Sequence, residues 1–249
     1  MTAHIPSRCI AVAGIVCLIC GVVARAWMVV DWAIYGAYAR PCALDICLDI
    51  LKPECMLVYL CAPAAVLFYA LLMHDFDSRY VIAHPSRAAL ARHESMRAVE
   101  SSAFVSLGVL AVIAVCGMLF RIHWCNWGQA DSYTVVTLDD AAHPNPLLPT
   151  FLFALGVFAS LLLLQLILIV AKWATSSPWA PIPAYGVYCL LYFMALRHAL
   201  SFSASAVSGD DAIAAAARVL SAAVAVCILA NVVPRLPMVA RRDFCDGRV

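Results

Sequence analysis

Charged residues are scarce in this sequence. Only 12% of its 249 residues are Asp, Glu, Lys or Arg, whereas 65% are hydrophobic, a balance that a water-soluble domain of this length does not normally have. Basic residues exceed acidic ones by so little that the net charge is +1. Because proteins that bind nucleic acid need a large excess of Lys and Arg to neutralise phosphates, we expect no nucleic-acid partner.

Several motifs that carry chemistry are also missing. The sequence has no G-x-S-x-G and no H-E-x-x-H for hydrolysis, and no G-x-x-x-x-G-K-[ST] loop to bind nucleotide phosphates. Its twelve cysteines include no zinc-type pair of C-x-x-C motifs and no C-x-x-C-H for covalent haem. Cys17 and Cys20 form one C-x-x-C within an apolar run, where cysteine behaves as a small hydrophobe. We therefore expect no catalytic activity and no metal site.

Long apolar runs, in contrast, are abundant. A helix needs about 20 mostly apolar residues to cross roughly 30 Å of hydrocarbon with its backbone hydrogen bonds satisfied. Six runs meet this condition, at approximately 9–30, 56–72, 102–120, 148–171, 183–204 and 212–233. None alternates like a strand of a membrane barrel. We predict an all-α fold, a polytopic bundle of six transmembrane helices that forms a single domain over residues 1–249.

The basic residues indicate how this bundle is oriented. Loops rich in Lys and Arg stay on the cytoplasmic side of a membrane. One side of the predicted bundle receives Arg8, Arg79, Arg87, Arg92, Arg97, Lys172, Arg235, Arg241, Arg242 and Arg248. The loops on the other side are acidic. Both termini are therefore expected on the cytoplasmic side, and the membrane is expected to be a bacterial plasma membrane or, as the alternative, an organelle inner membrane.

The first apolar run has a second interpretation. Arg8, the apolar core that follows it and Ala24-Arg25-Ala26 together resemble a secretory signal peptide with its cleavage site. The apolar residues continue through Val30, so we favour a retained helix and keep cleavage after residue 26 as the alternative. The remaining topology is the same in both cases.

The loop between the second and third runs is the most distinctive polar segment. Ser86 is a suitable N-cap for a helix at approximately 86–100, in which Arg87, Arg92 and Arg97 alternate with apolar residues. A basic, partly apolar helix of this kind lies in the membrane interface. It either serves only to fix the topology or docks a cytoplasmic partner.

One family resemblance follows from this loop. The layout of six spans with both ends inside, together with the run Asp77-Ser78-Arg79-Tyr80-Val81-Ile82-Ala83-His84-Pro85-Ser86-Arg87, resembles the permease subunit of ABC-2-type transporters. In that family a short helix in this loop couples a separate ATPase to the membrane subunit.

The resemblance implies a homo- or hetero-oligomeric transporter subunit whose ATPase docks on residues 84–100. The docking candidates are His84, Ser86, Arg87, Arg92 and Arg97. The alternative function is that of a non-catalytic anchor or structural subunit in a larger membrane complex, respiratory or haem-handling.

Polar side chains within apolar runs are costly in lipid and point to functional sites. Four of them are candidates for a substrate path: Arg25, Gln165, Arg197 and His198. The alternative for the cations is that they extend to the membrane surface or pair with nearby aspartates.

Two histidines allow a different hypothesis, haem ligation, which needs two imidazoles that face each other across helices at similar depth. His123 lies at the end of the third run and His198 lies in the fifth. We expect no cofactor, and haem held by these two residues is the alternative.

Four cysteines fall in or beside the predicted outer loops: Cys42, Cys47, Cys55 and Cys125. An even number of cysteines in an oxidising compartment permits disulfides. Cys42–Cys47 would close a ring within the first of these loops, and Cys55–Cys125 would join the first loop to the second. Spacing alone does not choose among the three pairings or between disulfides and free thiols.

Overall fold

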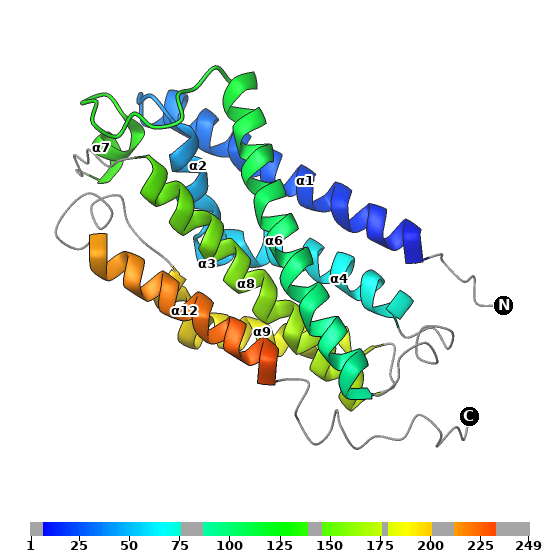
Figure 1. The fold of residues 1–249 in the computed structure, drawn as a ribbon. Helices are drawn as coiled ribbons and strands as arrows, with labels where there is room; N and C mark the ends of the chain where they lie inside the picture. Colours follow the sequence, from blue (N-terminus) through cyan, green and yellow to red (C-terminus); the bar gives the residue numbers. More distant parts are fainter. Residues whose placement is uncertain (1–6, 76–86, 139–145, 176–178, 201–211, 233–249) are drawn as a thin grey trace.

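The fold is a bundle of helices. The computed structural model describes residues 7–75, 87–138, 146–175, 179–200 and 212–232 (Figure 1). Within these residues there is no strand, and the extended pairing amounts to two isolated bridges, Arg40 to Ser132 and Cys42 to His123. The prediction of an all-α fold is therefore confirmed.

The long helices run beside one another through the bundle. They are α1 (Ser7–Asp31), α4 (Ala62–Asp75), α6 (Arg87–Leu119), α8 (Leu147–Ala174) and α12 (Ala212–Val232). The shorter elements are η1 (Trp32–Gly36), α2 (Ala43–Ile50), α3 (Pro53–Cys55), η2 (Met56–Cys61), α7 (Tyr133–Leu138), α9 (Pro181–Leu191), η3 (Tyr192–Leu196) and α10 (Arg197–Leu200), where η marks a π-helix.

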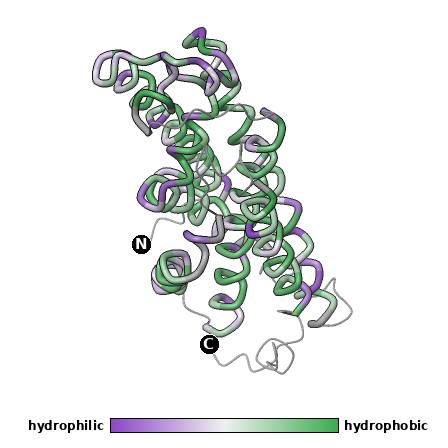
Figure 2. Tube along the Cα trace, turned by 90° about the vertical axis from the view of Figure 1, so that its left-hand side faces the viewer, coloured by the Kyte–Doolittle hydropathy of each residue, from purple (hydrophilic) through white to green (hydrophobic). Residues whose placement is uncertain are grey.

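Within the part of the chain that the structure describes, five continuous helical segments are long and apolar enough to cross a membrane. They are Arg8–Gly36, Pro53–Leu72, Ala89–Leu119, Leu147–Ala174 and Ile213–Val232. Hydrophobic residues cover most of the length of the long helices, and a group of hydrophilic residues lies at one end (Figure 2). Each of these segments contains or closely matches one of five of the six predicted spans; Ala89–Leu119 begins thirteen residues before the predicted third span, and Arg8–Gly36 ends six residues after the predicted first span. They indicate an integral membrane protein.

The fifth predicted span, 183–204, is the exception. It is divided into α9, η3 and α10, and its continuous apolar part, Pro181–Met194, is too short to cross about 30 Å of hydrocarbon as a helix. Residues 201–211 lie outside the described residues. The count of six spans stays a prediction.

The predicted interfacial helix at 86–100 is not a separate element. Residues from Arg87 onward belong to α6, which continues without a break to Leu119. No proline or glycine interrupts the sequence between Arg87 and Gly108. The Ser101 hydroxyl donates a hydrogen bond to the Arg97 carbonyl one turn earlier (2.7 Å), which is compatible with a continuous helix. The prediction was wrong in dividing this helix from the third span.

α8 occupies the centre of the bundle. It contacts α4, α6, α9 and α12. Its sequence is apolar on all sides apart from Thr150, Ser160, Gln165 and the terminal Lys172, as expected for a helix that is surrounded by others. α1 instead packs closely on α4. A Cβ atom on Gly14 would come within 2.9 Å of the Leu67 backbone, and one on Gly21 within 2.7 Å of the Tyr59 carbonyl, so glycine is needed for this close approach.

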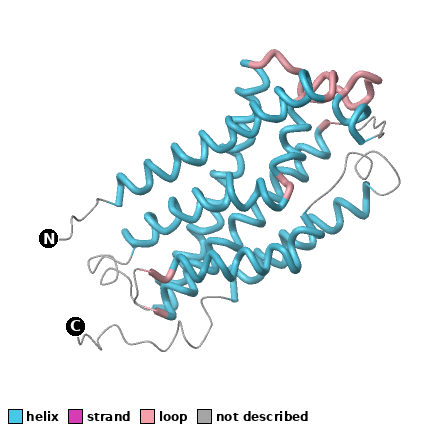
Figure 3. The backbone as a smooth tube through the Cα atoms, turned by 180° about the vertical axis from the view of Figure 1, so that it is seen from behind, coloured by secondary structure: helices cyan, strands magenta, loops and turns pink. Residues whose placement is uncertain are grey.

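The loops that precede α2 and α7 lie together at one end of the bundle (Figure 3). We call residues 37–52 and 120–138 the cap, and this end of the molecule the capped end. α1 runs toward the capped end, and α6 reaches it at Leu119 (Figure 1). The cap holds buried carboxylates and their hydrogen-bond donors, among them Asp45 and Trp127.

The last turn of α6 enters the cap through a left-handed residue. The Ile122 amide donates to the Gly117 carbonyl (3.0 Å) and the Arg121 amide to the Met118 carbonyl (3.2 Å), the two hydrogen bonds of a Schellman motif. Arg121 has a φ of 55°, a region that costs a residue with a Cβ about 1 kcal/mol.

Replacing Arg121 by glycine is expected to raise the free energy of unfolding by about 1 kcal/mol, because glycine has no Cβ to strain the left-handed turn. Thermal unfolding of the purified protein would measure the gain. Arg121→Ala is the matched control, since it removes the same charged side chain but keeps the Cβ. An equal gain in both variants would show that the side chain, and not the backbone, is responsible.

Candidate functional site

α2 is a short helix enclosed within the bundle. It contacts α1, α6 and α8, and all of its residues except Leu48 are buried. It nevertheless carries two carboxylates, Asp45 and Asp49, which are only 3% and 7% exposed. Their spacing of four residues places them on one face of the helix, one turn apart. Because buried carboxylates are costly in an apolar bundle, this helix is the candidate functional site.

Asp45 is held by hydrogen bonds without a cation. Its Oδ1 accepts from Trp127 Nε1 (2.8 Å) and from the Thr134 hydroxyl (2.6 Å), and its Oδ2 accepts from the Cys42 amide (2.8 Å). No Lys or Arg among the described residues forms an ion pair with it. Burial raises the pKa of Asp45, and the three hydrogen bonds oppose that shift.

Asp49 is shared by two cations. Its Oδ2 accepts from Arg25 Nε (3.0 Å) and also from Nη2 of the same guanidinium, while its Oδ1 accepts from Lys52 Nζ (2.8 Å). Burial acts to lower the pKa of Lys52, but the hydrogen bond and the charge of Asp49 outweigh it and raise that pKa. Arg25 and Lys52 together carry one more charge than Asp49, so this group has one positive charge in excess.

Backbone hydrogen bonds join the two loops of the cap. The Ala43 and Leu44 amides donate to the carbonyls of His123 (3.0 Å) and Trp124 (3.1 Å), and the Tyr133 amide donates to the Arg40 carbonyl (2.9 Å). These bonds hold the fully buried Trp127 against Asp45. The cap is thus a single packed unit in which α2 is the innermost part.

The four cysteines near the cap are free thiols in the structure: Cys42, Cys47, Cys55 and Cys125. Burial raises the pKa of the thiols of Cys42, Cys47 and Cys125, and the charge of Asp45 adds to the shift. Neutral buried thiols are poor nucleophiles. The loops are joined here by hydrogen bonds, and pairing of these cysteines as disulfides stays a prediction.

A second polar region lies between α6 and α8. Gln165 Oε1 accepts from the hydroxyls of Ser101 (2.8 Å) and Ser102 (3.2 Å). Toward the end of the bundle opposite the cap, Trp173 Nε1 donates to Glu94 Oε2 (2.7 Å). These contacts fasten the two helices along their length and account for the polarity of Gln165 within an apolar helix.

Three tyrosines join α9 and η3 to the end of α2 and to η2. The Tyr185 hydroxyl donates to the Leu57 carbonyl (2.7 Å), and the Tyr192 hydroxyl donates to the Leu51 carbonyl (3.4 Å). Between them the buried Tyr188 hydroxyl lies 3.2 Å from Cys61 Sγ. Leu57 and Cys61 belong to the π-helix η2, a geometry that often marks functional segments.

The structure does not bring the predicted substrate-path residues together. Arg25 of α1 donates to Asp49 of α2, and Gln165 of α8 accepts from Ser101 of α6. Arg197 and His198 are exposed on α10, where Arg197 Nε lies 3.2 Å from His198 Nε2. Of the four, Arg25 alone belongs to the candidate site.

The predicted docking residues that the structure describes lie at the other end of the molecule. His84 and Ser86 fall outside the described residues, and Arg87 begins α6. Arg92 is exposed and Arg97 is half-buried. Both belong to the first turns of α6, at the end that Trp173 and Glu94 fasten to α8.

The predicted haem ligands belong to different parts of the fold. His123 is exposed in the cap, and His198 lies on α10, which packs against α12. No group of three or more His, Cys, Asp and Glu side chains within the described ranges is placed to hold a metal ion. Haem ligation stays a prediction, which an absorption spectrum of the purified protein would test.

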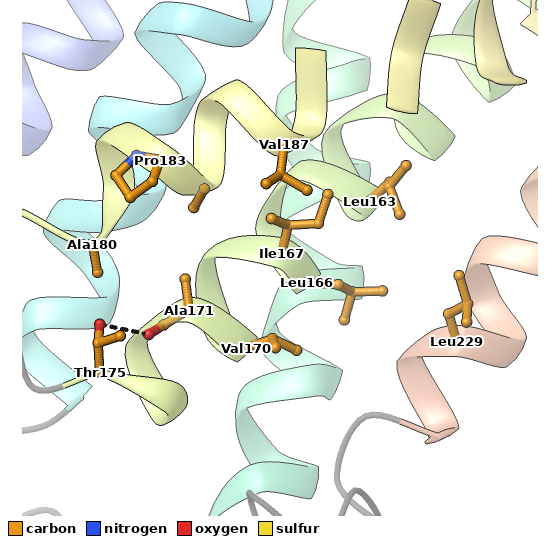
Figure 4. Close-up of a pocket in the computed structure, with 11 residues that line it drawn as sticks. Leu163, Leu166, Ile167, Val170, Ala171, Thr175, Ala180, Pro183, Val187 and Leu229 are labelled. Carbon is orange, nitrogen blue, oxygen red and sulfur yellow. Dashed lines mark hydrogen bonds between the residues drawn. The ribbon is translucent and has the colours of Figure 1, made fainter. Parts of the chain in front are cut away.

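An apolar pocket of about 440 Å³ opens between α8, α9 and α12 (Figure 4). Leucine, isoleucine, valine, alanine and proline line it, with Thr175 at one edge. The Thr175 hydroxyl donates to the Ala171 carbonyl (2.9 Å), so its polarity is used within α8. The pocket suits a hydrocarbon chain and offers no group to orient a polar ligand.

Sequence reasoning missed Asp45, Asp49, Trp127 and Thr134 as a site. One signal was available, because Asp45 stands three residues after Cys42, the spacing at which an acidic side chain bonds the N-cap amide of a helix. No family model, curated protein or solved structure matches the chain.

Proposed function

We propose that this chain is the membrane-embedded permease subunit of an ATP-driven transporter, with six transmembrane helices, both termini in the cytoplasm and a separate ATPase docked on the polar end of α6. The observation that carries the proposal is α6 itself. Its 33 residues form one helix, about 50 Å long, with arginines at one end and the cap at the other.

α6 can transmit movement because both of its ends are attached. At the polar end, Glu94 accepts the hydrogen bond from Trp173 of α8. At the capped end, α6 leads through the Schellman turn into the loop whose Trp127 donates to Asp45 of α2. A displacement of the polar end would therefore reach α2, and in this proposal α2 is the element that opens the capped end.

The exposed basic residues suit the docking of a partner. Arg92 and His93 are exposed near the start of α6, and Met96 is 53% exposed beside them. A basic surface with an apolar side chain matches an acidic groove on a cytoplasmic protein. The sequence resemblance to ABC-2-type permeases assigns such a partner to the same segment.

Co-purification tests the proposal. The tagged chain, isolated from membranes of its own source, should carry a protein with a G-x-x-x-x-G-K-[ST] motif, identified by mass spectrometry. The variant Arg87→Glu with Arg92→Glu should lose about tenfold or more of that protein, because reversed charges repel an acidic docking groove. The matched control is Arg40→Glu, which reverses an exposed cation in the cap.

Retention of the ATPase by the double variant at the wild-type level would contradict docking on α6. Recovery of redox subunits in place of an ATPase would instead support the anchor-subunit alternative.

A further inference from the structure

A groove runs along the outside of the bundle between α1 and the helix formed by η2 and α4. Its volume is about 340 Å³, and small residues of α1, among them Ala13, Cys17 and Gly21, form one wall. Tyr59 and Pro63 belong to the other wall. The groove exists because these side chains are short where their neighbours on the same helix are not.

Charge is found at one end of this groove. Arg25 lies one helical turn beyond Gly21 on α1, and its guanidinium carbon stands 5.3 Å from the centre of the Tyr59 ring, which lines the groove. Asp49 neutralises one of the two cations, Arg25 and Lys52. The side chain of Lys52 is 54% exposed, so the excess positive charge is accessible from outside.

The position along α1 places this charge at the depth of lipid headgroups. The apolar segment that begins at Arg8 continues to Gly36, and about 20 residues cross the hydrocarbon. Counting them from Arg8 brings the far boundary close to Met28, within one turn of Arg25. A lysine at that level extends its ammonium group to the interface.

We propose that this groove binds an anionic phospholipid, with one acyl chain between α1 and α4 and the phosphate at Lys52, in the field of Arg25. A groove that is apolar along its length and cationic at one end is complementary to a molecule with one charged end and a long apolar body. The inference rests on a membrane location and is independent of any transport activity.

A second copy of the chain is the less suitable occupant. Small residues on a membrane helix often serve contacts between chains, but here Gly14 and Gly21 are already in contact with Leu67 and Tyr59 of the same chain. A partner helix in the groove would also need a negative charge opposite Lys52.

Native mass spectrometry of the purified full chain tests the site. The protein is mixed with phosphatidylglycerol or with phosphatidylcholine at equal concentration, and the retained lipid is counted. The wild type should retain more phosphatidylglycerol. Lys52→Gln should reduce that retention about three- to tenfold, because it removes a charge-assisted hydrogen bond to phosphate. It leaves Asp49 paired with Arg25, so the fold is preserved.

The apolar half of the site has its own variant. Cys17→Phe fills the groove and should reduce retention of phosphatidylglycerol, whereas Val12→Phe adds the same ring to an exposed position of α1 outside the groove and should not. Arg40→Gln is the control for charge, since Arg40 is an exposed cation of the cap.

Equal retention of the two lipids by the wild type would overturn the proposal, as would wild-type retention of phosphatidylglycerol in both Lys52→Gln and Cys17→Phe. A change of oligomeric state in Cys17→Phe with unchanged lipid retention would assign the groove to a second copy, and would also overturn it.

Discussion

Replacing Asp45 by alanine is expected to lower the free energy of unfolding by about 3 to 5 kcal/mol. The substitution removes the acceptor for three donors at once, Trp127 Nε1, the Thr134 hydroxyl and the Cys42 amide. Each donor left buried without a partner costs about 1–3 kcal/mol. Because these hydrogen bonds join the second loop of the cap to α2, we expect unfolding to begin in the cap.

Asparagine at the same position separates hydrogen bonding from charge. Its side-chain oxygen can accept from Trp127 and Thr134, but its amide group would face the Cys42 amide, one donor against another. Asp45→Asn is therefore expected to melt between the wild type and Asp45→Ala. The apparent melting temperature in detergent, followed by size-exclusion chromatography, gives this order.

Asp131→Ala is the matched control for Asp45→Ala. Asp131 belongs to the same cap and pairs with Arg40 at 2.9 Å, but the two side chains are 51% and 76% exposed. An exposed pair of this kind contributes under about 1 kcal/mol. If Asp45→Ala melts within the range of Asp131→Ala, the hydrogen bonds of Asp45 do not hold the cap.

The long helices could be predicted from the sequence because hydrocarbon thickness fixes their length. α8 was expected at 148–171 and extends over Leu147–Ala174. α12 was expected at 212–233 and extends over Ala212–Val232. In both cases the predicted run and the described helix agree within three residues at each end.

The enclosed helix α2 could not be predicted in the same way. Its eight residues are too few for a membrane span, and Asp45 and Asp49 resemble loop residues when they are read without their partners. Those partners come from distant parts of the chain, Arg25 for Asp49 and Trp127 for Asp45. Burial of a carboxylate depends on such long-range contacts, which spacing along the sequence does not reveal.

The separate interfacial helix was predicted from the positions of charged residues, and those positions did not show whether the helix continues into the third span. Arg92 and Arg97 differ sharply in polarity from the apolar residues after Ser102, but a helix continues through a change of polarity when its backbone is not interrupted. Gln165 was predicted as a site residue because it is a single polar residue within an apolar run. Its partners Ser101 and Ser102 lie on α6, and serine in an apolar run gives little signal.

Replacing Asp49 by leucine is expected to cost about 3 kcal/mol or more, because it leaves an arginine charge inside the bundle without a carboxylate. The side chain of Arg25 is 18% exposed, whereas that of Lys52 is 54% exposed. Lys52 can therefore turn toward water more readily than Arg25 when Asp49 is lost. The cost of Asp49→Leu is expected to come almost entirely from Arg25.

The reverse substitution should be milder. Arg25→Leu leaves Asp49 with the hydrogen bond from Lys52 Nζ (2.8 Å), so the carboxylate keeps a cation. The two single variants are thus expected to be unequal, with Asp49→Leu the less stable. Melting temperatures of the two purified proteins, at equal detergent and salt concentration, measure the difference.

The double variant Arg25→Leu with Asp49→Leu shows whether the loss of stability comes from breaking the ion pair or from each residue separately. Removing both charges leaves apolar side chains in an apolar bundle and a lysine that can reach water, so the double variant is expected to be more stable than Asp49→Leu alone. A coupling of about 1–3 kcal/mol between the two sites is expected in the double-mutant cycle. A loss in the double variant equal to the sum of the two single losses would show that Arg25 does not depend on Asp49.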